Sequence, residues 1–149
     1  MVGSEEKGPG HGTQVEGGKS LWCPVRKKHL ADRPEERVRL RVIERLRELG
    51  YPLSAMQVEY QVGQAGRFDL AVFTRSGDIW MLVECKQALP GQARTDIALA
   101  ARAQAGRYAQ ALERRWKVHY LGIAIGERLH CFHYPTRQWI REIPPYPAQ

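Results

Sequence analysis

Two apolar runs separated by a short turn constrain the fold of this chain most. They read RFDLAVFT at residues 67–74 and IWMLVECKQ at residues 79–87, with Ser76 and Gly77 between them. These two turn residues suit a tight two-residue β-hairpin connection. Both runs are apolar on both faces, which is typical of strands covered on two sides. We therefore expect a buried hairpin in the middle of a sheet.

The hairpin carries charged residues at one end. Centring the turn on Ser76 and Gly77 predicts these opposed pairs: Thr74 with Ile79, Phe73 with Trp80, Ala71 with Leu82, and Asp69 with Glu84. Strand alternation places Lys86 on the same face as Glu84. It also predicts one apolar face of Phe68, Leu70, Val72, Met81, Val83 and Cys85, and another of Ala71, Phe73, Trp80 and Leu82.

Two opposed carboxylates destabilise a sheet unless one is protonated or a cation lies between them. Glu84 and Lys86 alone would ordinarily be interpreted as an exposed ion pair at the surface. Asp69 at the opposed position favours a metal site instead. Carboxylate oxygens suit a hard ion such as Mg²⁺.

The surrounding pattern predicts an α/β fold. We expect helices over 34–49 and 95–114, and strands near 56–62, 67–74, 79–87, 117–125, 128–134 and 137–141. The first three strands should form an antiparallel meander, with the second helix crossing over to the fourth strand. Residues 1–20, rich in Gly and charge, are expected to be a disordered tail, and residues 21–149 a single domain.

Each helix offers further polar candidates. The apolar stripe of Val38, Val42, Leu46 and Leu49 extends back to Glu35, which predicts that Glu35 shares the buried face, although a first-turn glutamate also favours the helix dipole. On the second helix Gln104 falls within the stripe of Ile97, Ala101, Ala105, Tyr108 and Leu112. A polar residue under the helix and a Tyr ring in the core would explain Gln104 and Tyr108 equally well.

The net charge, the cysteines and the absence of long apolar stretches limit the partners and the cellular compartment that are expected. The chain has 149 residues and a formal net charge of +7, which makes a polyanion a plausible partner. The three cysteines resemble neither a disulfide framework nor a metal-binding pair, so a reducing cytoplasm is expected. No export signal or membrane-length apolar stretch is present, and no membrane partner is expected.

Several segments in order resemble a known family. They are WCPVRKK, PEERVR, LGYP, GRFDLAVF, LVECKQA, the Gln104 to Tyr108 spacing, and EIPPY. Together they are similar to the N-terminal nuclease domain of type I restriction enzyme R subunits, in a short stand-alone form. Asp69 followed by Glu84-Cys85-Lys86 resembles the PD-(D/E)xK nuclease superfamily, without the proline of its name.

The resemblance implies a restriction-endonuclease-like αβββαβ core with a mixed sheet flanked by helices. Residue by residue, it implies that Asp69 and Glu84 are metal ligands, Lys86 is the catalytic lysine, and a first-helix glutamate completes the site. The stripe favours Glu35 for that role, with Glu36 as the alternative. The Cys85 carbonyl is a further candidate ligand, and the residues expected to support the site or contact DNA are Gln104, Tyr108, Arg67 and Arg107.

The expected function is Mg²⁺-dependent DNA cleavage, with Mn²⁺ as a substitute ion. DNA is the expected partner, and the resemblance is compatible with a separate motor or specificity protein and with a homodimer. Because no Walker motif is present, the chain is not expected to translocate DNA by itself. The alternatives are a non-catalytic nucleic-acid-binding or partner-recruited module with the same fold, and a protein-interaction subunit.

Overall fold

The computed structural model describes residues 14–15, 18–63 and 66–148. Its elements are β1 (Gln14–Val15), β2 (Gly18–Cys23), β3 (Lys28–Ala31), α1 (Pro34–Glu48), η2 (Leu53–Ala55), β4 (Met56–Val62), β5 (Gly66–Phe73), β6 (Ile79–Lys86), α2 (Arg94–Leu112), β7 (Val118–Ile125), β8 (Arg128–His133) and β9 (Gln138–Ile140). The two helices and six later strands agree with the sequence prediction to within one or two residues.

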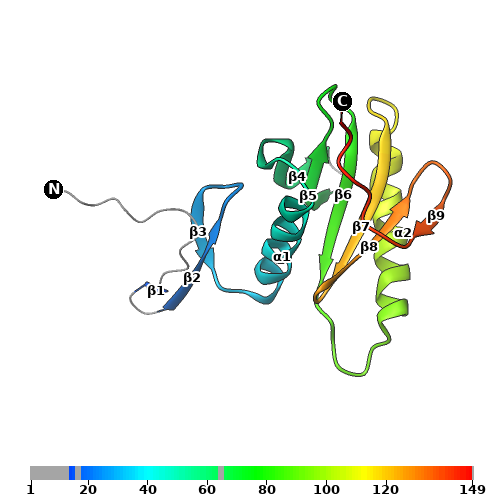
Figure 1. Cartoon of the computed structure of the whole chain (residues 1–149). Coiled ribbons are helices and arrows are strands. Elements are labelled where there is room, and N and C mark those ends of the chain that lie inside the picture. The colour runs from blue at the N-terminus through cyan, green and yellow to red at the C-terminus, as the bar shows by residue number, and fades with distance from the viewer. Residues whose placement is uncertain (1–13, 16–17, 64–65, 149) are drawn as a thin grey trace.

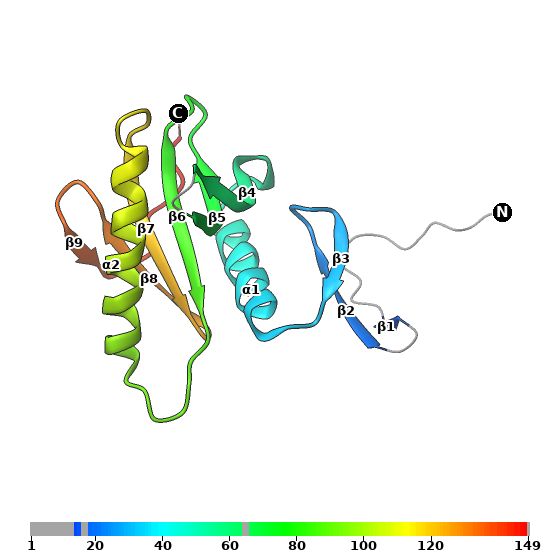
Figure 2. The same ribbon diagram turned by 180° about the vertical axis from the view of Figure 1, so that it is seen from behind.

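A mixed sheet forms the centre of the molecule. Among the described residues its six strands run in the order β4-β5-β6-β7-β8-β9, with β6 and β7 parallel and the other neighbours antiparallel. The two views place α1 and α2 on opposite faces (Figures 1 and 2). The predicted α/β class, the antiparallel meander and the helical crossover are confirmed.

Each helix covers its own hydrophobic core. On the α1 face, Leu70, Val72, Met81 and Val83 pack against Val38, Val42, Ile43 and Leu46. On the α2 face, Phe68, Ala71 and Leu82 pack against a helix surface of small residues, Ala98, Ala101, Ala105 and Ala109. These alanines allow α2 to lie close to the sheet. Since α1 covers one face of β6 and α2 the other, the strand is apolar on both faces.

The β5–β6 register matches the prediction away from the turn. Leu70 pairs with Val83, Ala71 with Leu82, and Val72 with Met81. The turn itself was predicted wrongly. Thr74 N–H donates to the Asp78 carbonyl at 2.8 Å, which closes a three-residue loop with Gly77 at φ +99°. A left-handed third residue is characteristic of such loops, and a bulge between Val72 and Phe73 restores the register beyond it.

Pairing and face assignments near both ends of the hairpin also differ from the prediction. Phe73 pairs with Ile79 instead of Trp80, and Trp80 packs on the α1 face rather than beside Leu82. Phe68 packs on the α2 face rather than with Leu70. Strict alternation of the side chains therefore fails near the turn and between Phe68 and Leu70, the residues on either side of Asp69.

The first-helix stripe also differs from its prediction. Leu49 lies past the end of α1 and is 43% exposed, whereas Ile43 is fully buried. Glu35 is exposed, so the inference that it shares the buried face is wrong. The stripe does not continue back to Glu35 because the buried residues begin at Val38, and the first turn lies beyond the covered surface. Arg39, whose burial was not predicted from the sequence, is only 4% exposed.

Segments outside the core pack onto the α1 face. The β2–β3 hairpin contributes the fully buried Cys23, and Tyr51 Oη donates to the carbonyl of Pro144 at 2.5 Å. The predicted tail over 1–20 lies largely outside the described residues, and its described parts belong to β1 and β2. No helix in the part of the chain that the structure describes is long and apolar enough to cross a membrane.

Candidate active site

Asp69 lies where β5 leaves its regular pairing with β6. The last regular pair is Leu70 with Val83, and one step further the Asp69 carboxylate accepts a hydrogen bond from Cys85 N–H at 2.6 Å. The side chain thus bridges the two strands at the end of the hairpin opposite the turn. Asp69 and the segment Glu84–Lys86 are brought together as the sequence predicted.

Glu84 is a buried carboxylic acid beside Asp69. Its side chain is among the few buried charged groups, at 5% exposure. Burial, and then the negative charge of Asp69, raise the pKa of Glu84 to about 7, while the positive charge of Lys86 opposes the rise. An acid with this pKa is half ionised near neutrality, and an added cation would stabilise its ionised form.

Cys85 lies between these two residues and is buried. Burial, followed by the charge of Asp69, raises the pKa of its thiol well above the usual range. The sulfur is therefore a neutral thiol at physiological pH and a poor ligand, because metals bind the thiolate. If Cys85 binds a metal, its ligand atom would be the carbonyl oxygen, which is the atom proposed from the sequence.

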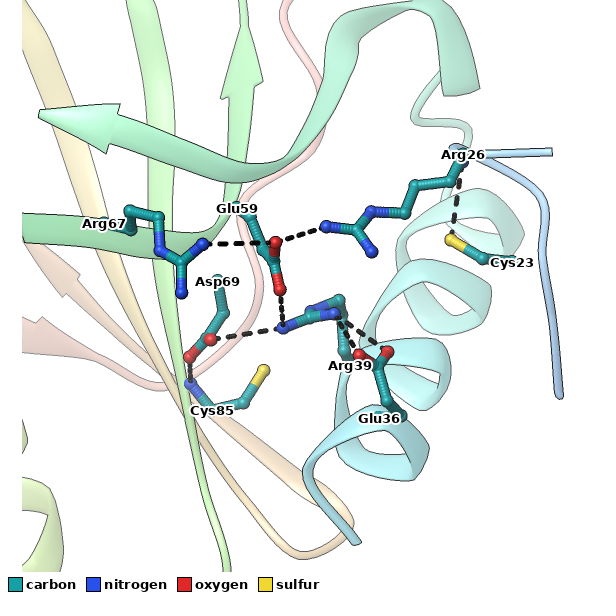
Figure 3. Close-up of polar contacts among 8 residues, drawn as sticks. All are labelled: Cys23, Arg26, Glu36, Arg39, Glu59, Arg67, Asp69 and Cys85. Atoms are coloured by element: carbon teal, nitrogen blue, oxygen red, sulfur yellow. Dashed lines mark hydrogen bonds and ion pairs between the residues drawn. The ribbon is translucent and has the colours of Figure 1, made fainter. Parts of the chain in front are cut away.

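A buried arginine from α1 reaches the same point (Figure 3). Arg39 Nη1 donates to both carboxylate oxygens of Glu36 at 2.8 Å, and Nη2 lies 3.4 Å from Asp69 Oδ1 and 3.7 Å from Glu59 Oε2. Burial lowers the pKa of Arg39, but the charges of Glu36 and Asp69 outweigh that effect and raise it. The guanidinium is therefore a permanent cation among three carboxylates.

Glu59 on β4 completes this cluster. Its backbone has φ +56°, an uncommon conformation for a residue other than glycine. It accepts hydrogen bonds from Arg26, in the β2–β3 turn, and from Arg67 Nη1 at 3.5 Å (Figure 3). Burial raises the pKa of Glu59, but the Arg26 hydrogen bond and the surrounding positive charges lower it overall.

The two helix glutamates differ in their surroundings. Glu36 is half-buried and occupied at both oxygens by Arg39. Glu35 is exposed, and its negative charge is only a minor contribution to the raised pKa of Cys85. Glu35 thus lies outside the buried face, and no hydrogen bond or ion pair between it and Asp69 or Glu84 is seen among the described residues.

The remaining predicted residues make other contacts. Gln104 Nε2 donates to Tyr108 Oη at 3.3 Å, and the Tyr108 ring packs edge-on against Phe68 with centroids 5.5 Å apart. Tyr108 therefore supports β5 beside Asp69. Arg67 is exposed on β5 and touches Glu59, and Arg107 is exposed on α2.

A family model for the N terminus of the type I restriction enzyme R protein matches residues 34–145. The chain belongs to this family. No match is found among curated proteins. The matched range contains α1, the six-stranded sheet and α2, and therefore the cluster around Asp69, but not the β2–β3 hairpin.

The residues at the end of β5 and β6 fit a hard divalent cation by their chemistry. Mg²⁺ is commonly held by one or two carboxylates, with waters and substrate phosphates filling the other positions. Asp69 and Glu84 supply two, and the raised pKa of Glu84 is the effect that a bound cation would reverse. Among the residues that the structure describes, no group of three or more His, Cys, Asp or Glu is arranged to hold a metal by itself.

Arg39 and Glu59 were not predicted from the sequence to lie at the site. A signal for Arg39 existed, because it lies four residues before Ile43 and three before Val42 on the buried side of α1. An arginine inside an apolar stripe indicates a buried cation with acidic partners. Glu59 gave no such signal, since nothing local predicts its backbone conformation.

Proposed function

We propose that this protein is a metal-dependent DNA nuclease of the PD-(D/E)xK type, with a restriction-endonuclease-like core. The observation that carries the proposal is the junction of Asp69, buried Glu84 and Lys86 at one end of β5 and β6. Membership in a restriction-enzyme family supports it, as does the order α1-β4-β5-β6-α2-β7. The net charge of +7 suits a nucleic-acid substrate.

In this proposal Asp69 and Glu84 would hold Mg²⁺ or Mn²⁺, with the Cys85 carbonyl and Glu35 as further candidate ligands. Glu35 is favoured over Glu36 because Arg39 already occupies both oxygens of Glu36. When bound, the ion would polarise a phosphate oxygen and lower the pKa of a coordinated water.

Lys86 is the proposed catalytic group of the chain itself. It is half-buried and close enough to Glu84 to oppose the rise in the pKa of that acid. Its Nζ would orient the attacking water as an ammonium, or accept the proton of that water as a neutral amine, and the resulting ammonium would offset the negative charge that develops on the phosphate. Gln104 and Tyr108 would support the site from the α2 face of the sheet, by holding the strand that carries Asp69 in place.

The test is cleavage of plasmid, linear duplex, single-stranded and branched DNA with Mg²⁺, Mn²⁺ or EDTA. Wild type is expected to cut only with metal, and Lys86→Ala is expected to bind DNA but lose at least about 100-fold in rate. Lys117→Ala, exposed before β7, is the matched control and is expected to cut like wild type. Equal activity in Lys86→Ala would contradict the assignment, and metal-independent binding without cleavage by wild type would favour a binding module.

A further inference from the structure

The cation that contacts Asp69 has no role in the chemistry proposed above. We propose that Arg39 is a positioning residue for Asp69, and that Glu59 holds Arg39 in place while linking it to Arg26 of the N-terminal hairpin. The inference rests on the proposed function only where it treats Asp69 as a metal ligand. The arrangement of the side chains is independent of that assumption (Figure 3).

The geometry of Arg39 explains why it can position another group. Its side chain is 5% exposed, and one edge of the guanidinium is fixed by the two 2.8 Å bonds to Glu36 on its own helix. A planar guanidinium fixed at one nitrogen presents its other nitrogen in a set direction. That second nitrogen, Nη2, faces Asp69 Oδ1 at 3.4 Å and Glu59 Oε2 at 3.7 Å.

Asp69 is thereby held at both oxygens. Oδ2 accepts the Cys85 N–H at 2.6 Å, and Oδ1 faces Arg39. These are restraints from different layers, one from the neighbouring strand and one from the helix above the sheet. Loss of the Arg39 restraint would leave the carboxylate free to rotate about its bond to Cβ, which would weaken its bond to Cys85.

Glu59 is the anchor on the other side of Arg39. Its left-handed backbone and its bond to Arg26 hold its carboxylate at the position where both arginines meet. Residues in such conformations persist where the surrounding structure fixes them, and they cluster at functional sites. The hairpin, which lies outside the matched family region, thus contributes to the site through Arg26 and Glu59.

The Cys85 amide proton reports directly on Asp69, without metal or DNA. A short hydrogen bond to a carboxylate moves an amide proton downfield. In a two-dimensional ¹H–¹⁵N spectrum of the metal-free protein, Arg39→Lys is expected to move the Cys85 resonance upfield, because an ammonium cannot hold Glu36 and Asp69 at once. Glu59→Gln is expected to move it in the same direction, to a smaller extent. Arg75→Lys, in the turn at the opposite end of the hairpin, is the matched control and is expected to leave it unchanged.

An unmoved Cys85 resonance in folded Arg39→Lys would overturn the proposal. If Arg39→Lys does not fold, Glu59→Gln decides by the same criterion. Titration of Mn²⁺ by calorimetry extends the test to the site, where both variants are expected to bind about 10- to 100-fold more weakly than wild type and Arg75→Lys. Wild type that binds no Mn²⁺ would contradict the proposed function, whereas unchanged Mn²⁺ affinity in both variants, with wild type binding, would contradict the positioning role alone.

Discussion

At the scale of single residues, the main feature is a buried acid whose ionisation works against folding. Glu84 is buried beside Asp69, and its pKa is raised from the ordinary value of 4.5 to about 7. The folded state therefore binds the proton more tightly than the unfolded state does. Stability that depends on this proton is fully present below pH 4.5 and is lost as pH rises through about 7.

We therefore expect Glu84→Gln to change the pH dependence of folding in EDTA. At pH 8 the variant should be more stable than wild type, by no more than about 3 kcal/mol, and the difference should shrink towards pH 5. Urea denaturation at the two pH values measures it. Glu127→Gln, in an exposed turn, should show no such change. A difference between Glu84→Gln and wild type that is independent of pH would contradict the raised pKa.

At the scale of elements, β5 is held against α2 by an unusually close contact beside the site. Gly66 has φ +143°, and a Cβ there would lie 2.7 Å from Tyr108 Oη. The absence of a side chain lets the Tyr108 ring reach Phe68, next to Asp69. Tyr108, which accepts a hydrogen bond from Gln104, thus packs against β5, and no polar contact of this pair with the carboxylates is seen among the described residues.

Gly66→Ala is expected to lower the free energy of unfolding by about 1–3 kcal/mol, because it adds both backbone strain and a collision with Tyr108. Gly63→Ala is the control, since Gly63 also has a positive φ of +50° but open space around its Cα. Gly63→Ala should lower the free energy of unfolding less than Gly66→Ala does. Thermal and urea denaturation measure both variants, and equal losses would show that the contact with Tyr108 is unimportant.

At the scale of the whole molecule, segments from both ends of the chain close the α1 face. The segment after β9 is held by two tyrosines: Tyr51 Oη donates to the Pro144 carbonyl and accepts from Trp80 Nε1 at 3.0 Å, and Tyr146 Oη donates to the Phe73 carbonyl at 2.7 Å. The β2–β3 hairpin lies beside α1, and its Arg26 joins the cluster near Asp69 (Figure 1).

Tyr51→Phe is expected to lower the free energy of unfolding by about 1–3 kcal/mol, because it leaves the Trp80 indole N–H and the Pro144 carbonyl without their shared partner. Tyr120→Phe is the matched control: it lies in the same aromatic cluster, and no hydrogen bond of its hydroxyl is seen among the described residues. Urea denaturation compares them. A cost for Tyr51→Phe no larger than that for Tyr120→Phe would contradict the proposed docking of the C-terminal segment.

The local part of this organisation could be predicted from the amino-acid sequence. Periodicity and turn residues located both helices and the six strands of the central sheet, and the β5–β6 pairing brought Asp69 to Glu84, because these signals depend on neighbours along the chain. The α/β class, the crossover through α2 and the resemblance to the R-protein family followed from the same segments.

Only the tertiary structure decided what surrounds those residues. The burial of Arg39, the left-handed backbone of Glu59 and the docking of Arg26 depend on which segment lies over which face of the sheet. The exposure of Glu35 shows the same limit, since a helical stripe indicates one side of a helix but not where its partner surface ends. The sequence by itself therefore determined the elements and the acidic pair, and the packing between layers decided which charges meet there.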